Sequence, residues 1–152
     1  MSLVRKSNTG KYGLVYHIVP PYGLMNDPNG LIYFKGQYHV FFQWNPTDTK
    51  HANKHWGHLV SDDMIQWKRV ELALAPDQWF DKSGVYSGSA YVHNDQLWLF
   101  YTGNVKDDEG NASSYQCLAI SEDGIHFEKK GPLFEHPKGY TRHVRDPKVW
   151  YD

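Results

Sequence analysis

The chain has 152 residues, of which 40% are hydrophobic and 16% aromatic, and this length suits one ordinary domain. Its 16 basic and 17 acidic residues leave a net charge of −1, which argues against a nucleic-acid partner. No apolar run is long enough to cross a membrane, and a single cysteine, Cys117, excludes an internal disulfide.

Eight strands are predicted, in two groups of four. In chain order they cover residues 30–34, 38–44, 56–61 and 65–70, then 86–92, 96–102, 115–121 and 125–130. Aromatic residues favour strands, and the apolar run at residues 40–42 fits a strand that is covered on both faces. Turns are predicted at residues 35–37 and 61–63, and residues 72–76 connect the two groups. Helix signals are almost absent, so the predicted fold class is all-β.

The two groups of strands are copies of one another. Residues 60–69 align with residues 120–129 at an offset of 60, and residues 38–42 align with residues 97–101 at an offset of 59. A fixed period of this kind indicates a repeat architecture, and units of four strands are typical of propeller blades. Trp67 and Phe127 take matched positions in the alignment and are predicted to lie in the core.

The repeat predicts more blades than the chain supplies. A propeller typically has 4–8 blades, whereas this chain holds about two, plus the first strand of a third at Val149-Trp150-Tyr151. We therefore expect residues 16–152 to be the N-terminal part of a larger propeller, preceded by a lead-in at residues 1–15. The outer strands of such a piece would be left unpaired.

An Asp-Pro turn is predicted at equivalent points of the repeat. Asp27-Pro28 comes before the first predicted strand and Asp146-Pro147 before Val149, while Ser87 takes the corresponding place in the second unit. Two carboxylates at equivalent positions of repeated units can come together around the central axis of a propeller. A pair of carboxylates that faces one glycosidic bond can catalyse its hydrolysis. The run from Asn26 to Gly30 is also a good turn sequence without any function; the second Asp-Pro favours the functional interpretation.

Several longer motifs accompany these turns. In chain order they are Tyr16-His17, Pro20-Pro21, Met25-Asn26-Asp27-Pro28-Asn29-Gly30, Phe41-Phe42-Gln43-Trp44-Asn45-Pro46, His55-Trp56-Gly57-His58-Leu59-Val60-Ser61, Tyr86-Ser87-Gly88-Ser89, Thr102-Gly103-Asn104 and Arg145-Asp146-Pro147. Together they resemble glycoside hydrolase family 32, the invertase, levanase and sucrose-6-phosphate hydrolase family, over residues 16–152. The resemblance implies a five-bladed β-propeller of four-stranded antiparallel blades, followed by a β-sandwich. It is nearest to the bacterial sucrose-6-phosphate hydrolases.

The resemblance also implies an activity and a set of site residues. The activity is retaining hydrolysis of terminal β-D-fructofuranosides, such as sucrose or its 6-phosphate, without a cofactor or a metal. Asp27 would be the nucleophile and Asp146 the stabiliser of the transition state. Six further residues would contact the sugar or line its pocket: Asn26, Gln43, Trp56, Tyr86, Ser87 and Arg145. The partner implied is a small sugar, and the sequence gives no indication of oligomeric state.

The chain departs from the family pattern in two places. The acid/base of the family is the glutamate of a Glu-Cys motif, but here Cys117 follows Gln116, so the chain alone is expected to be inactive. Members often carry a tryptophan in the loop after Asn-Pro, whereas residues 47–54 carry His51, which leaves substrate choice open. His55 and His58 could suggest a zinc pair, but residues three apart on a strand point to opposite faces.

Two alternative functions and one location complete the predictions. The chain could be a non-catalytic propeller piece that binds fructans, or part of a related five-bladed glycosidase acting on arabinosides. Asn26 before Asp27, and the triplet at residues 145–147, favour the fructosidase. The start of the chain lacks the apolar segment of a signal peptide, which predicts a cytoplasmic protein, although a chain cut after a removed signal would look the same.

Overall fold

The structure is a computed structural model that describes residues 13–14, 17–141 and 143–152. Tyr16 and most of the predicted lead-in at residues 1–15 lie outside the described residues. Eight strands and no helix are present in the described part, so no helix there could span a membrane. The strands are β1 (Leu24–Phe34), β2 (Gln37–Asn45), β3 (His55–Ser61), β4 (Lys68–Arg69), β5 (Gly84–His93), β6 (Gln96–Lys106), β7 (Ala112–Ser121) and β8 (Glu128–Glu135).

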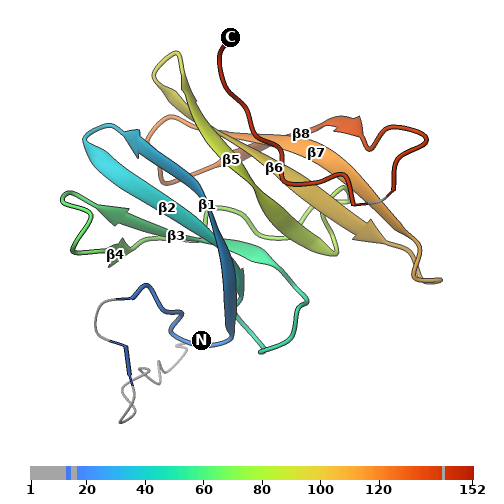
Figure 1. The fold of residues 1–152 in the computed structure, drawn as a ribbon, viewed down its shortest axis with the longest axis horizontal. Coiled ribbons are helices and arrows are strands. Elements are labelled where there is room, and N and C mark those ends of the chain that lie inside the picture. Colours follow the sequence, from blue (N-terminus) through green and yellow to red (C-terminus); the bar gives the residue numbers. More distant parts are fainter. Residues whose placement is uncertain (1–12, 15–16, 142) are drawn as a thin grey trace.

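The strands form two antiparallel sheets of four, in the orders β1-β2-β3-β4 and β5-β6-β7-β8 (Figure 1). Each sheet is a meander in which sequence neighbours pair, as expected of a propeller blade. The first strands of the two sheets, β1 and β5, lie next to each other. The predicted all-β class and the two four-stranded units are therefore confirmed. The two blades meet along their first strands, β1 and β5.

The fourth strand of each blade starts later than predicted, because the preceding turn is longer. In the first blade the Asp63 carboxylate accepts hydrogen bonds from the amides of Ile65 (2.8 Å) and Gln66 (2.7 Å). Asp123 does the same for Ile125 and His126, both at 2.8 Å. These amides bond to a side chain in place of a neighbouring strand, so β4 and β8 begin three residues after the predicted positions 65 and 125.

The predicted first strand of a third unit is wrong for this structure. Residues 143–152 are assigned to no strand and instead run across the second blade, as the dark red segment in Figure 1 shows. Its amides bond to side chains of that blade: Asp146 N donates to Thr102 Oγ1 (3.1 Å) and Val149 N to Ser89 Oγ (3.2 Å). A strand requires a ladder of backbone partners, and these contacts replace one.

The core lies between the two blades and is rich in aromatic rings. Trp56 is fully buried and packs against Phe41 of its own blade (centroids 5.7 Å apart) and Tyr101 of the other blade (6.3 Å). Phe127 packs edge-on against Phe41 at 5.8 Å, which confirms its predicted place at the core. Trp67 is only half-buried and outside the core cluster, because it lies before the short outer strand β4 and not between the blades.

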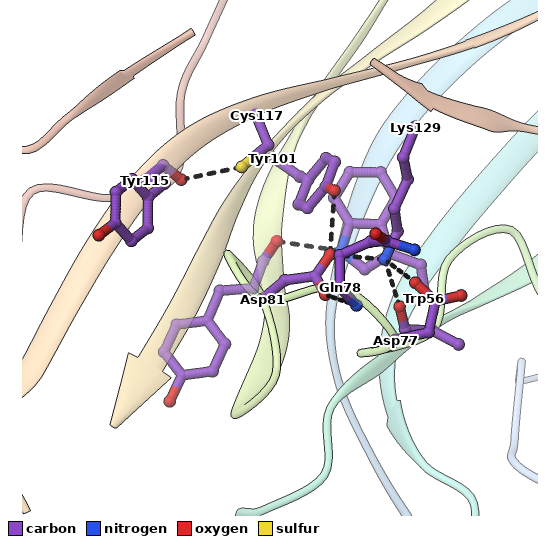
Figure 2. A network of polar contacts seen from close by, with 10 residues as sticks. Trp56, Asp77, Gln78, Asp81, Tyr101, Tyr115, Cys117 and Lys129 are labelled. Atoms are coloured by element: carbon purple, nitrogen blue, oxygen red, sulfur yellow. Dashed lines mark hydrogen bonds and ion pairs between the residues drawn. The ribbon is translucent and has the colours of Figure 1, made fainter. Parts of the chain in front are cut away.

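A buried polar network joins the connector between the blades to β8 (Figure 2). The Asp81 carboxylate is fully buried and accepts hydrogen bonds from the Tyr101 hydroxyl (3.1 Å) and the Gln78 amide (2.9 Å). The ammonium group of Lys129 contacts Asp81 and, at 2.7 Å, Asp77. A buried carboxylate is tolerated only when it is paired in this way. The network therefore fixes the connector immediately before β5.

A buried histidine in the first blade makes the fold sensitive to acid. His58 is 1% exposed, and its Nε2 lies 2.9 Å from His39 Nδ1. Burial, and next the charge of His39, lower the pKa of His58 to about 3. A histidine in the unfolded chain titrates near 6.5, so below that pH the unfolded state binds a proton that the folded state does not.

We expect the free energy of unfolding of the chain to fall by about 2 kcal/mol between pH 7 and pH 5 through His58 alone. The sign follows from a depressed pKa, since the stability is present above pH 6.5 and is lost as the pH falls. Urea titrations at both pH values measure the loss, with His58→Gln as the variant that cannot titrate. An equal loss in both proteins would contradict this account of His58.

Candidate functional site

Asp27 lies inside β1 and not in a turn before it. β1 pairs with β2 from Leu24 onward, but the register skips Asp27, since Asn26 faces Gln43 and Pro28 faces Phe42. Pro28 has no N–H to contribute to the ladder, and Asp27 adopts a left-handed φ of 38°. The feature is thus a β-bulge, which re-aims one side chain out of a paired strand. The predicted turn and strand start at this point were wrong.

The same device recurs in the other units of the repeat. In β5 the register skips Ser87, since Tyr86 faces Thr102 and Gly88 faces Tyr101. Asp146 also has a left-handed φ, of 58°. Irregular backbone is therefore found at all three positions that the repeat alignment equates, Asp27, Ser87 and Asp146. Sequence periodicity predicts that the three residues take equivalent positions in the repeat, and the structure shows irregular backbone at each of these positions.

Seven of the eight predicted site residues line one cavity of about 340 Å³, here called the catalytic cavity after the role predicted for its two aspartates. They are Asn26, Asp27, Gln43, Tyr86, Ser87, Arg145 and Asp146. Within it the Ser87 hydroxyl donates to Asp27 Oδ2 at 3.3 Å. The charge of Asp27 also contributes to a raised pKa of Asp146. Residues from both blades and from the segment after β8 thus meet in one space.

The eighth predicted residue, Trp56, does not reach the cavity. Its ring is fully buried in the core, and its indole N–H donates to the Tyr86 carbonyl at 3.0 Å. Beside it, Gln43 Nε2 donates to the Val85 carbonyl at 2.8 Å. Both bonds run from the first blade to the β5 backbone just before Ser87. Trp56 therefore positions the cavity wall and does not form it.

The electrostatics of the cavity centre on Asp146. Burial raises the pKa of the Asp146 carboxyl; the Arg145 guanidinium lowers it, and the nearby Asp27 adds a smaller upward effect. Arg145 Nε lies 3.5 Å from Asp146 Oδ2. The Arg145 guanidinium opposes the upward shift of the pKa and so favours the charged form of Asp146, and a charged carboxylate stabilises a developing positive centre. The two carboxylates with Arg145 therefore suit a reaction that passes through a cation.

Two further residues line the catalytic cavity, and the sequence pointed to only one of them. His51 was noted as a departure from the family pattern, whereas Lys54 was not singled out. Lys54 is 4% exposed and its ammonium group donates to Asn26 Oδ1. Burial lowers the pKa of Lys54, and the charge of Asp27 opposes that shift. No spacing or residue type marks such a lysine in advance; only the fold places it beside the carboxylate.

The described residues offer no metal centre, since no three His, Cys, Asp or Glu side chains gather within them. His58, considered above for zinc, is bonded to His39. The catalytic cavity instead combines two carboxylates, two amides, two hydroxyls, a histidine and two cations. Amides and guanidinium groups recognise sugar hydroxyls, and a carboxylate can attack an anomeric carbon.

Known proteins are similar to this chain in sequence and in fold. Residues 17–152 match the family described as "Glycosyl hydrolases family 32 N-terminal domain". A sucrose-6-phosphate hydrolase of Bacillus subtilis is 59% identical over 144 residues, which cover 95% of this chain and 30% of that protein. A raffinose invertase of Escherichia coli is 47% identical over 152 residues, covering 97% of this chain and 31% of that protein. The chain thus spans about a third of the length of these relatives.

Solved structures of enzymes from this family are also similar to this chain in fold. The sucrose-6-phosphate hydrolase of Lactobacillus gasseri superposes with a TM-score of 0.87 and 39% sequence identity, covering 93% of this chain and 30% of that one. A β-fructofuranosidase of Bombyx mori gives a TM-score of 0.80 at 41% identity, covering 90% of this chain and 29% of that one. The chain belongs to glycoside hydrolase family 32, as the N-terminal domain match over nearly its whole length establishes.

Proposed function

We propose that this chain supplies the nucleophile, the stabilising carboxylate and the fructose-binding residues of an enzyme that hydrolyses terminal β-D-fructofuranosides with retention of configuration. The observation that carries the proposal is the presence of Asp27 and Asp146 in one cavity, with Ser87 bonded to Asp27. The relatives named above act, by their names, on sucrose 6-phosphate, fructofuranosides and raffinose. Sucrose 6-phosphate is the substrate we propose for this chain.

In the proposed reaction Asp27 attacks the anomeric carbon of fructose, and the bond from that carbon to the bridging oxygen breaks. The leaving oxygen takes a proton from a carboxylic acid, which the family resemblance assigns to a Glu-Cys motif that the 152 residues do not contain. Water then attacks the fructosyl ester and returns a proton to that same group, which releases Asp27 as a carboxylate. Asp146, in its charged form beside Arg145, stabilises the oxocarbenium-like state on both sides of the intermediate.

The remaining proposals concern organisation and place. We propose that residues 16–152 are the N-terminal part of the catalytic propeller and that residues 1–15 lead into it. Further blades would close the ring around the catalytic cavity. A sugar phosphate is charged and crosses a lipid bilayer only at great cost, so an enzyme for such a substrate works where the phosphate is added. This argument supports a cytoplasmic location.

The purified chain of 152 residues should release fructose from neither sucrose nor sucrose 6-phosphate above background. General acid–base assistance is worth about 10²–10⁴-fold, and none of the residues that line the catalytic cavity is a glutamate. Activity should return in the completed enzyme, in which this chain is joined to the C-terminal remainder of the Bacillus subtilis relative. Robust turnover by the chain alone would contradict the assignment of the acid to another segment. A folded completed enzyme that binds fructose but hydrolyses nothing would favour a sugar-binding function.

A further inference from the structure

A second cavity, of about 280 Å³, shares a wall with the catalytic cavity. Tyr86 and Arg145 line both. A fructose over Asp27 would therefore have this second space as its neighbour. The second cavity is here called the basic cavity, for the side chains Lys106, His143 and Arg145 that line it.

The floor of the basic cavity is built by the end of the β6–β7 ladder. Asn104 and Lys106 are two residues apart on β6 and therefore share a face. Their partners in the ladder are Ser114 and Ala112. The described residues that line the cavity include no carboxylate. The basic cavity thus differs from the catalytic cavity in its charge, since two carboxylates line the catalytic cavity.

One buried donor in this floor has no partner. Asn104 is 7% exposed, and its side-chain Nδ2 is buried without a hydrogen bond in the described structure. An unsatisfied buried donor destabilises the folded protein, so such a group usually has a reason, such as binding a ligand. The neighbouring polar side chains are already engaged, since Thr102 bonds to Gln116 and Ser114 to the Val144 carbonyl. Asn104 is the one whose N–H remains available.

The charges around the cavity favour an anion. Lys106 has no ion-pair partner within the part of the chain that the structure describes, and the only one of Arg145 there is Asp146, reached through Nε. The guanidinium therefore keeps further N–H donors for a ligand. In the acidic turn that follows β6, the Asp107 carboxylate is used within the turn, because it accepts hydrogen bonds from the backbone amides of Glu109 and Asn111. Neither Asp107 nor Glu109 lines the cavity.

We propose that the basic cavity binds the phosphate group of a phosphorylated leaving sugar, with Lys106, Arg145 and Asn104 Nδ2 as its donors. A phosphate monoester offers acceptor oxygens with negative charge, and charge-assisted bonds from lysine and arginine are the strong ones. The inference rests on the proposed function above, because it takes the fructose position from that site. It gives a reason for selecting sucrose 6-phosphate over sucrose.

The test compares Lys106→Met with Lys68→Met in the completed enzyme. Both lysines are exposed, and Lys68 lies on β4 outside both cavities. Lys106→Met should raise KM for sucrose 6-phosphate about tenfold, because one charge-assisted hydrogen bond is lost. The value of kcat/KM for sucrose should stay unchanged, which also shows that the variant is folded. Lys68→Met removes the same charge and should change neither value.

Two outcomes would overturn the inference. If both sugars are hydrolysed and Lys106→Met changes KM for neither, the cavity does not read phosphate although the proposed function stands. If the completed enzyme hydrolyses neither sugar, calorimetry on the 152-residue chain decides. The unchanged chain should bind glucose 6-phosphate about tenfold more tightly than Lys106→Met does. The two chains should bind glucose, which has no phosphate, equally. Equal binding of glucose 6-phosphate by both chains would refute the proposal.

Discussion

Replacing Asp27 with asparagine in the completed enzyme is expected to lower kcat by about 10⁴-fold or more, because removing a nucleophile eliminates the covalent route and not merely a contact. The fold should survive. Asp27 has a left-handed φ of 38°, and asparagine tolerates this region about as well as aspartate does. The amide oxygen of an asparagine can also accept the bond from the Ser87 hydroxyl. The melting temperature should therefore be nearly unchanged.

A matched control separates this catalytic effect from a general effect of the substitution. Asp95 also has a left-handed φ, of 58°, and lies on the surface, where its carboxylate is 3.4 Å from Lys35 Nζ. Asp95→Asn should leave both kcat and the melting temperature unchanged. Steady-state assays and thermal unfolding on the two variants measure the difference. Near-normal turnover by Asp27→Asn would refute the assignment of Asp27 as nucleophile.

Asp146→Asn is expected to lower kcat by about 10²–10³-fold, since a charge aimed at the transition state is typically worth this much. Asparagine suits its φ of 58°. The ion pair with Arg145 is lost, but both side chains are about half exposed, and exposed pairs contribute little to stability. Thermal unfolding should therefore show a small change beside a large kinetic one.

The two aspartate variants should fail in different ways. Asp146→Asn keeps the nucleophile, so it should still form a fructosyl-enzyme, only more slowly. Asp27→Asn should form none. Rapid-quench kinetics on both variants measure this difference. A fructosyl-enzyme that accumulates normally in Asp146→Asn would show that Asp146 does not act on the first step.

Sequence periodicity predicts the two blades but not the β-bulge at Asp27. The offsets of 59 and 60 residues came from matching strands, and two four-stranded sheets confirm them. The composition of the run around Asp27-Pro28 is that of a turn and predicts one there. In the structure the same residues lie within β1, where Pro28 interrupts the ladder and a bulge absorbs the extra residue. A β-bulge and a turn use the same left-handed backbone, so composition does not separate them.

Long-range packing decided the residues that the sequence misplaced. Trp56 was predicted to line the pocket, but its ring fills the seam between blades and bonds to the β5 backbone. Lys54 was overlooked, although the fold buries it against Asn26 in the catalytic cavity. Neither position shows a periodicity or a motif that reports which neighbour the side chain meets. Such facts depend on how one blade packs against the next.

The covalent intermediate provides the most direct test of the central claim that Asp27 is the nucleophile and Asp146 is not. The completed enzyme is mixed with excess substrate, quenched with acid during turnover, digested, and analysed by mass spectrometry. The account predicts one fructosyl group, carried by the peptide that contains Asp27, in the unchanged enzyme and in Asp146→Asn alike. A fructosyl group on the peptide that contains Asp146 would contradict it.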